Sequence, residues 1–288
     1  MDVTGSIDTK DPNDTNKEVR RIYEDLFGSS LFDRVEHTLY DVVRLFEGNY
    51  PGYHKCDTRY HDLEHTLQAY LAAARIIDGL IRETPARMPQ EFAVLSLIGT
   101  IGHDTGFIKE TWDTEGSGAK YTLTHVSRSS EFMAKYLLKS KFSSSQVQSV
   151  QNMISCTGLD GDLSKIHFTS EREKEAGCVL GTADYLGQMS DPNYVEKLPL
   201  LYDEYEEGHF PGYDSAQDLL QKTPKYFEDF VMKRLIEDFQ SVYQFAATHF
   251  GGKNLYIEGI KKNIELVKHS LKSDRVSSAK AEHRQPRS

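Results

Sequence analysis

The chain has 288 residues, a formal net charge of −10 and a pI near 5.6. This length is enough to bury a sizeable core in one large domain or two small ones. The acidic balance argues against binding a nucleic-acid polymer nonspecifically, because no basic stripe exists to release counterions from phosphates. An anionic substrate would therefore need local positive charge, and bound metal ions are one way to supply it.

The longest apolar run, residues 92–102 (FAVLSLIGTIG), has about half of the ~20 residues that a membrane-spanning helix needs. It predicts a buried helix, and no secretory signal is recognisable at the start of the chain. The three cysteines, Cys56, Cys156 and Cys178, are odd in number and form no CxxC pair, which suits a reducing cytosol better than a disulfide framework. We therefore expect a cytoplasmic protein with no membrane partner and no cysteine-based zinc site.

Two polar ends enclose a chain with helical periodicity. Residues 1–16 and 273–288 carry few apolar side chains and are predicted to be disordered tails. The first amphipathic helix follows Ser30 as a candidate N-cap and stops near Gly48. Further helices are predicted, in chain order, at 61–82, 89–104, 125–139, 145–156 and 171–189, then as a short acidic helix after residues 190–194, as a long pattern from Thr223-Pro224 to Phe250, and at about 254–271. No strand is compelled, so one all-α domain over residues 17–272 is the simplest interpretation.

The stretch HDLEH at residues 61–65 places two histidines four residues apart. In a helix, His61 and His65 lie on the same face, one turn apart. A histidine on a helix face is more often a hydrogen-bonded packing residue than a ligand. The pair therefore needs support from elsewhere in the chain.

That support comes from His103 and Asp104, which end the apolar helix, and from Asp184, which lies among apolar and small residues. A histidine near a helix C-terminus and an aspartate in a turn have an ordinary structural explanation. Ionisable side chains in such apolar segments are nevertheless costly unless they are paired or bound to a metal. Together with His65 they form an imidazole and carboxylate set that suits Mn, Fe, Mg or Zn.

A histidine, then an HD pair at a helix end, then a lone aspartate on a later helix is a pattern that resembles the HD-domain metal-dependent phosphohydrolase superfamily. YHDLEHT resembles the YHNxxHA motif of class I cyclic nucleotide phosphodiesterases, and GTADYLG resembles their ATDLA segment. The resemblance covers roughly residues 58–190. It implies an all-α, HD-domain-like helical bundle with one or two divalent metal ions.

The resemblance also implies residue roles. It places His65, His103, Asp104 and Asp184 on a first metal, with Asp104 bridging to a second. His61 would protonate the leaving oxygen, and His125 resembles the histidine that binds or supports the second metal, although a position in the first turn of a helix would equally explain His125. The implied reaction is hydrolysis of a phosphodiester or nucleotide phosphate by metal-activated hydroxide, with cyclic nucleotides among the candidate substrates. His61 and Asp104 would be the catalytic residues.

This chain departs from the relatives in the residues that follow HD. Class I enzymes read xDHPG, whereas this chain has Thr105-Gly106-Phe107-Ile108. Phe107 stands where HD-GYP enzymes have lysine, with Lys109 two residues later, and the Glu-Asp pair of stringent-response hydrolases is missing. The substrate subclass stays open for this reason, and Gln240 and Gln244 match the purine-clamping glutamine by residue type alone.

The substrate pocket is expected beside the Asp184 helix, in residues 196–213 and just before them. Connecting segments next to a rigid site often determine ligand choice. Tyr194, Leu198 and Tyr202 are therefore predicted to line the pocket together with Lys109. Ordinary helix packing is the alternative for the first three of these residues. The expected partner is a small phosphorylated molecule, preferably a nucleotide.

Three other readings stand beside the hydrolase. HDLEH also matches HxxEH, a zinc-protease motif in which His61 and His65 bind zinc and Glu64 acts as base. A metal-binding regulatory or ligand-sensing module would keep the ligands without catalysis. A purely structural helical scaffold would bind no metal.

Overall fold

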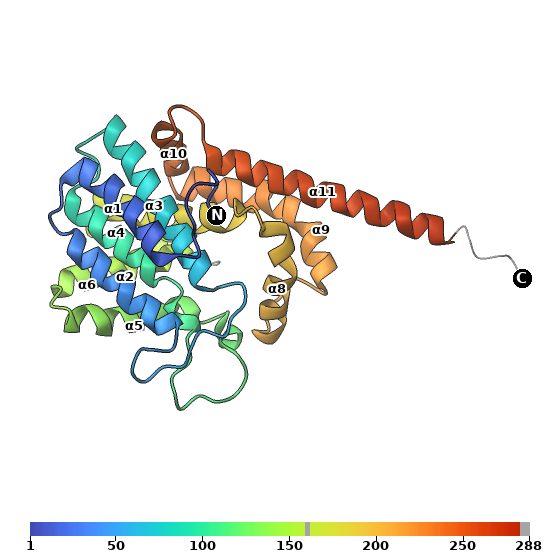
Figure 1. The fold of residues 1–288 in the computed structure, drawn as a ribbon, viewed down its shortest axis with the longest axis horizontal. Coiled ribbons are helices and arrows are strands. Elements are labelled where there is room, and N and C mark those ends of the chain that lie inside the picture. The colour runs from blue at the N-terminus through green and yellow to red at the C-terminus, as the bar shows by residue number, and fades with distance from the viewer. Residues whose placement is uncertain (159–161, 283–288) are drawn as a thin grey trace, which may run out of the picture.

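A computed structural model of the chain describes residues 1–158 and 162–282, with side chains up to residue 272. Eleven α-helices form the described part, which contains no β-strand beyond an isolated bridge between Tyr53 and Glu110. The helices pack into one bundle, from which α11 projects (Figure 1). The predicted all-α fold is confirmed.

The helix bounds agree with many of the predicted ranges. The helices are α1 Pro12–Phe27, α2 Phe32–Phe46, α3 Leu63–Glu83, α4 Gln90–Gly102, α5 His125–Lys139, α6 Ser144–Ile154, α7 Glu171–Met189, α8 Tyr194–Glu207, α9 Ala216–Tyr226, α10 Phe245–His249 and α11 Leu255–Glu282. The predicted ranges 125–139 and 171–189 match α5 and α7 at both ends. Ser30 does not cap α2, because the N-cap position is Leu31 in the left-handed region. No helix in the described ranges is both long and apolar enough to cross a bilayer.

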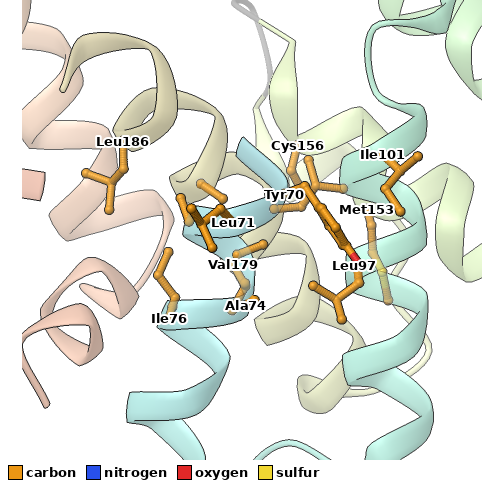
Figure 2. Packing of buried hydrophobic residues seen from close by; sticks show 14 of the residues in the cluster. Tyr70, Leu71, Ala74, Ile76, Leu97, Ile101, Met153, Cys156, Val179 and Leu186 are labelled. Carbon is orange, nitrogen blue, oxygen red and sulfur yellow. The ribbon is translucent and has the colours of Figure 1, made fainter. Parts of the chain in front are cut away.

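Helix α3 forms the centre of the bundle and packs against α4 and α7 (Figure 2). Side chains along α3 are buried on every face from Glu64 to Ile81. A Cβ atom added at Gly187 of α7 would lie 2.8 Å from the backbone nitrogen of Ala69 in α3, so this glycine permits the two helices to approach closely. Ser96 Oγ of α4 donates a 2.9 Å hydrogen bond to the carbonyl of Ala176 in α7. These contacts fix the three helices that carry the candidate site.

The prediction of a disordered tail over residues 1–16 is wrong. Helix α1 begins at Pro12 with Asp11 as its N-cap, and Asp2 is buried in a 2.5 Å ion pair with Arg75 of α3. The segment docks although it is polar, because the buried guanidinium needs a counter-charge. Over residues 273–282 the predicted C-terminal tail is wrong as well, since α11 continues to Glu282, and residues 283–288 lie outside the described residues.

The long helix predicted from Thr223 to Phe250 is broken. Helix α9 already begins at Ala216, contains Pro224, and is followed by π-helical turns at Phe227–Val231 and Arg234–Asp238. A proline inside a helix removes one backbone hydrogen bond and crowds the preceding turn, which favours a wider turn beside it. This helical segment then ends at Gln240 and Ser241, whose backbones both have a positive φ.

Candidate metal centre

Three helices bring four ionisable side chains together. His65 lies in the first turn of α3, where the Asp62 side chain accepts a 3.0 Å hydrogen bond from its backbone N–H. His103 and Asp104 follow directly on the end of α4, and Asp184 projects from the middle of α7. The two histidines are 38 residues apart in sequence, so only the packing of α3 against α4 and α7 can place them side by side.

The donor atoms of this cluster converge on one point. Nε2 of His65 lies 3.2 Å from Nε2 of His103, 3.2 Å from Oδ2 of Asp104 and 3.2 Å from Oδ1 of Asp184. Nε2 of His103 lies 3.3 Å from Asp104 Oδ2 and 3.6 Å from Asp184 Oδ1. Ligands bound to one metal at about 2.1 Å lie about 3.0 Å apart in an octahedron and about 3.4 Å apart in a tetrahedron. The ligand atoms of His65, His103 and Asp104 therefore lie close enough together to share a divalent ion, and Asp184 adjoins this group through the two histidines.

Hydrogen bonds to the cluster leave its metal-facing atoms free. His103 Nδ1 lies 2.7 Å from the carbonyl of Thr100, to which it donates, so Nε2 keeps its lone pair. Asp104 Oδ2 is buried and makes no hydrogen bond with any described residue. Two imidazole nitrogens and an orphaned carboxylate oxygen in contact are explained by a cation between them. The residues present thus fit a divalent metal.

The electrostatics of the cluster also call for positive charge. Burial alone would lower the pKa of His65, but the adjacent carboxylates of Asp104 and Asp184 outweigh it and raise this pKa to about 9. Burial opposes the charge of His103 in the same way, and Asp104 and Asp184 raise its pKa. Although burial favours the neutral acids, the two histidines hold the pKa values of Asp104 and Asp184 below their ordinary range. Without a metal, protons on the imidazoles supply the charge that the carboxylates require.

His61 faces a different partner. Its Nδ1 lies 2.6 Å from Oε2 of Glu204 on α8, and Oε1 of Glu204 accepts from the backbone N–H groups of Arg59 and Tyr60, each at 2.6 Å. Burial would raise the pKa of Glu204, but His61 and these N–H groups hold it below its ordinary value. The ionised Glu204 orients the ring, so Nε2 of His61 points away from Glu204, and His61 also lines the cavity described below.

This geometry also bears on the HxxEH interpretation. That motif needs His61 and His65 on one metal with Glu64 free to act as base. Instead, His61 contacts Glu204, and Glu64 forms a 3.0 Å ion pair with Lys197 of α8. The arrangement gives Glu64 a structural role in holding α8 against α3.

His125 lies on the other side of Asp104. Its Nε2 is 3.9 Å from Asp104 Oδ1, and its Nδ1 lies 2.7 Å from the carbonyl of Thr122. Burial lowers the pKa of His125 and so favours its neutral form. Gly106 packs directly against the backbone of His125, where a Cβ atom would clash, which explains the glycine after HD. Asp104 therefore faces His65 and His103 with one oxygen and His125 with the other.

Phe107 packs against both outer histidines. Its ring stacks on His61 at a centroid distance of 4.5 Å and on His125 at 4.4 Å. The ring centroids of His61 and His125 remain 6.1 Å apart. The residue that departs from the HD-GYP pattern thus packs against both the candidate acid and the candidate second-metal ligand.

A cavity of about 780 Å³, part of it open to solvent, adjoins this cluster. Asp104, Asp184, His61 and His125 line one end, and Tyr194 and Leu198 line it as predicted. Tyr202 lies outside, because its hydroxyl lies 3.3 Å from Glu206 Oε1 and 3.2 Å from the carbonyl of Asp214. The lining also excludes Lys109, Gln240 and Gln244; Lys109 is buried in an ion pair with Asp57 at 3.0 Å.

The sequence did not point to several residues of this cavity. These are the lining residues Tyr185, Gln188, Tyr205, Tyr213 and Tyr226. The sequence did not point either to Glu204, which contacts the lining residue His61. The tyrosines come from α7, α8, α9 and the loop between the last two. Burial raises the pKa of each tyrosine, so the phenols stay neutral. An aromatic-rich segment was visible in residues 196–213, but nothing in its spacing showed which rings turn inward.

Comparison with known proteins places the chain in one family. The model of the family described as Npun_R2479-like matches residues 111–270, which include His125, Asp184 and Glu204. No curated protein and no solved structure matches the chain.

Proposed function

We propose that this chain, which belongs to the Npun_R2479-like family, is a metal-dependent phosphohydrolase that cleaves a phosphodiester or nucleotide phosphate. The observation that carries this proposal is the convergence of His65, His103, Asp104 and Asp184, with His–His and His–Asp distances of 3.2–3.6 Å. The HD-type order of these residues along the chain supports the same reaction class. In this proposal the protein works in the cytoplasm on a small phosphorylated molecule.

The ligand set would hold a divalent ion of the Mn, Mg, Fe or Zn class. When bound, such an ion lowers the pKa of water and stabilises charge on the phosphoryl oxygens. Asp104 would serve a second ion through its other oxygen, with His125 beside it. The two carboxylates and the neutral imidazoles orient one another and exclude bulk water from the buried side of the site.

His61 would donate the proton to the leaving oxygen. Its Nδ1 is occupied by Glu204, and its ring borders the cavity next to Asp104. A general acid must lie within hydrogen-bond reach of the atom that it protonates, which the shared cavity permits. Glu204 acts through His61 as a positioning residue.

The neutral aromatic part of the cavity would hold the organic part of the substrate. Tyr194, Tyr205 and Leu198 offer flat and apolar surfaces of the kind that bind a nucleobase. This supports a nucleotide among small phosphate esters.

Metal analysis of the purified protein, combined with hydrolysis assays, tests this function. Cyclic mononucleotides, cyclic dinucleotides, nucleoside phosphates and bis(4-nitrophenyl) phosphate form the panel. We expect bound Mn, Fe, Zn or Mg and metal-dependent hydrolysis of at least one ester. Bound metal without hydrolysis of any member would support a ligand-sensing module, and protein that binds no metal would support a structural scaffold.

A further inference from the structure

Gln188 occupies a distinctive place in the cavity. It lies on α7 one turn after Asp184, so the two side chains lie on the same face of the helix, about 5–6 Å apart at Cβ. The hydroxyl of Tyr60 donates a 2.8 Å hydrogen bond to Gln188 Oε1. Burial raises the pKa of Tyr60 well above its ordinary value, so this hydroxyl keeps its proton and needs an acceptor.

The Tyr60 contact fixes the orientation of the Gln188 amide. Because the amide oxygen accepts from Tyr60, the NH₂ group of Gln188 must point elsewhere. No residue in the described ranges accepts a hydrogen bond from that NH₂ group. Its nitrogen is also not one of the fully buried side-chain atoms that lack a hydrogen-bond partner. The amide therefore presents two free N–H donors at a residue that lines the cavity.

Other donors near the metal acids are few. Among the described residues that line the cavity, none is lysine or arginine. The hydroxyls of the three lining threonines already donate to backbone carbonyls at 2.7–2.8 Å; these are Thr122, Thr157 and Thr223. Tyr205 and Tyr213 belong to α8 and the loop after it, rather than to the helix of Asp184. Gln188 and Tyr185 are thus the lining residues of the metal-binding helix that carry a side-chain donor, and Gln188 is the one that lies one turn from Asp184.

We propose that Gln188 is a substrate-binding residue whose NH₂ group donates a hydrogen bond to a non-bridging oxygen of the phosphoryl group. This inference rests on the proposed function. A phosphoryl oxygen that faces away from the metals still needs a donor, because leaving it unpaired in the part of the cavity that is shielded from solvent is costly. A neutral amide held by Tyr60 supplies that donor without adding a charge beside the metal ligands.

Three substitutions test the role of the amide. Gln188→Ala removes both donors, Gln188→Glu replaces them with acceptors at nearly the same shape, and Tyr60→Phe keeps the amide but frees its rotation. Tyr202→Phe is the matched control, since Tyr202 also has a polar hydroxyl but lies outside the cavity. For each protein, metal content, binding of inorganic phosphate to the Mn-loaded form by calorimetry, and kcat and KM on bis(4-nitrophenyl) phosphate are measured.

Gln188→Ala should weaken phosphate binding by about 2- to 13-fold, the range that corresponds to one ordinary hydrogen bond. Gln188→Glu should weaken it further through charge repulsion, and Tyr60→Phe by less than Gln188→Ala. Metal content should equal that of the unaltered protein, and Tyr202→Phe should behave like it. Inorganic phosphate has no organic part, so a loss measured with it assigns the contact to the phosphoryl group.

Two results would overturn the inference while leaving the proposed function in place. One is unchanged phosphate affinity in Gln188→Ala and Gln188→Glu with full metal content, which includes the case where only organic esters lose affinity. The other is loss of metal from Gln188→Ala, which would make Gln188 part of the metal site. An unaltered protein that binds neither metal nor phosphate would overturn the proposed function itself.

Discussion

His61 and Glu204 should contribute to catalysis by different amounts. A general acid typically contributes roughly 10²–10⁴-fold, so His61→Ala should lower kcat by that range with metal still bound. Glu204→Gln removes the charge from a 2.6 Å hydrogen bond and leaves one acceptor oxygen for both His61 Nδ1 and the backbone N–H groups of Arg59 and Tyr60. Charge-assisted hydrogen bonds exceed neutral ones by about 1–1.5 kcal/mol, which predicts a loss of about 5- to 13-fold.

The leaving group decides whether this loss reflects proton donation. We expect both variants to lose less activity on bis(4-nitrophenyl) phosphate than on an ester with a poor alkyl leaving group, because nitrophenolate needs little protonation. Glu207→Gln is the matched control, since this acid lies on the same helix and bonds Ser117. Equal losses on both esters, or metal released from His61→Ala, would refute the role of His61 as acid.

The remaining predictions concern metal binding and stability. Metal at 100 times its Kd should stabilise the folded chain by about 2.7 kcal/mol, so a chelator should lower the melting temperature, and Asp104→Asn should abolish that difference. Gly187→Ala forces a Cβ atom against the backbone of α3, at 2.8 Å, and should cost about 1–3 kcal/mol in urea unfolding, whereas Gly259→Ala, with its nearest neighbour at 3.3 Å, should cost less. Burial opposes the charge of Asp2, but Arg75 outweighs it and lowers the pKa of Asp2. The pair therefore stabilises the fold at neutral pH and loses this effect progressively as the pH falls below about 4 and through the lowered pKa of folded Asp2, so Asp2→Asn should reduce the free energy of unfolding by about 3 kcal/mol at pH 7 and by clearly less at pH 3. A constant difference between pH 7 and pH 3 would contradict this assignment.

The cluster of His65, His103, Asp104 and Asp184 could be predicted because each residue breaks a local rule. Charged side chains interrupt segments that are otherwise apolar, and such interruptions are visible in the sequence. Helix α7 could be placed for a related reason, since its N-terminal signal is local: Ser170 is its N-cap, and the Ser170 hydroxyl accepts a hydrogen bond from the N–H of Glu173. A signal of this kind depends only on residues close to the end of the helix, so it can be read without knowing how the rest of the chain packs.

Glu204 could not be identified because its role depends on distant packing. It lies 143 residues from His61, in the acidic run YDEYEE. This run contains several acidic residues that the sequence does not distinguish, and only Glu204 contacts His61. The choice is made when Lys197 pairs with Glu64 and Asp191, which fixes the rotation of α8 against α3. No short motif encodes a helix rotation set by ion pairs to other elements.

The N-terminal segment shows the limit of arguing from composition. Residues 1–16 bury little apolar area, and low hydrophobicity ordinarily predicts disorder. Arg75, however, is buried within α3, where an unpaired guanidinium would be strongly unfavourable. Asp2 supplies the counter-charge of Arg75, and the hydroxyl of Tyr256 accepts a further 3.1 Å hydrogen bond from Arg75. The N-terminal segment is therefore ordered by the ion pair that it forms with a buried arginine. A buried arginine in an otherwise apolar helix therefore predicts a docked acid somewhere in the chain, although it does not say which one.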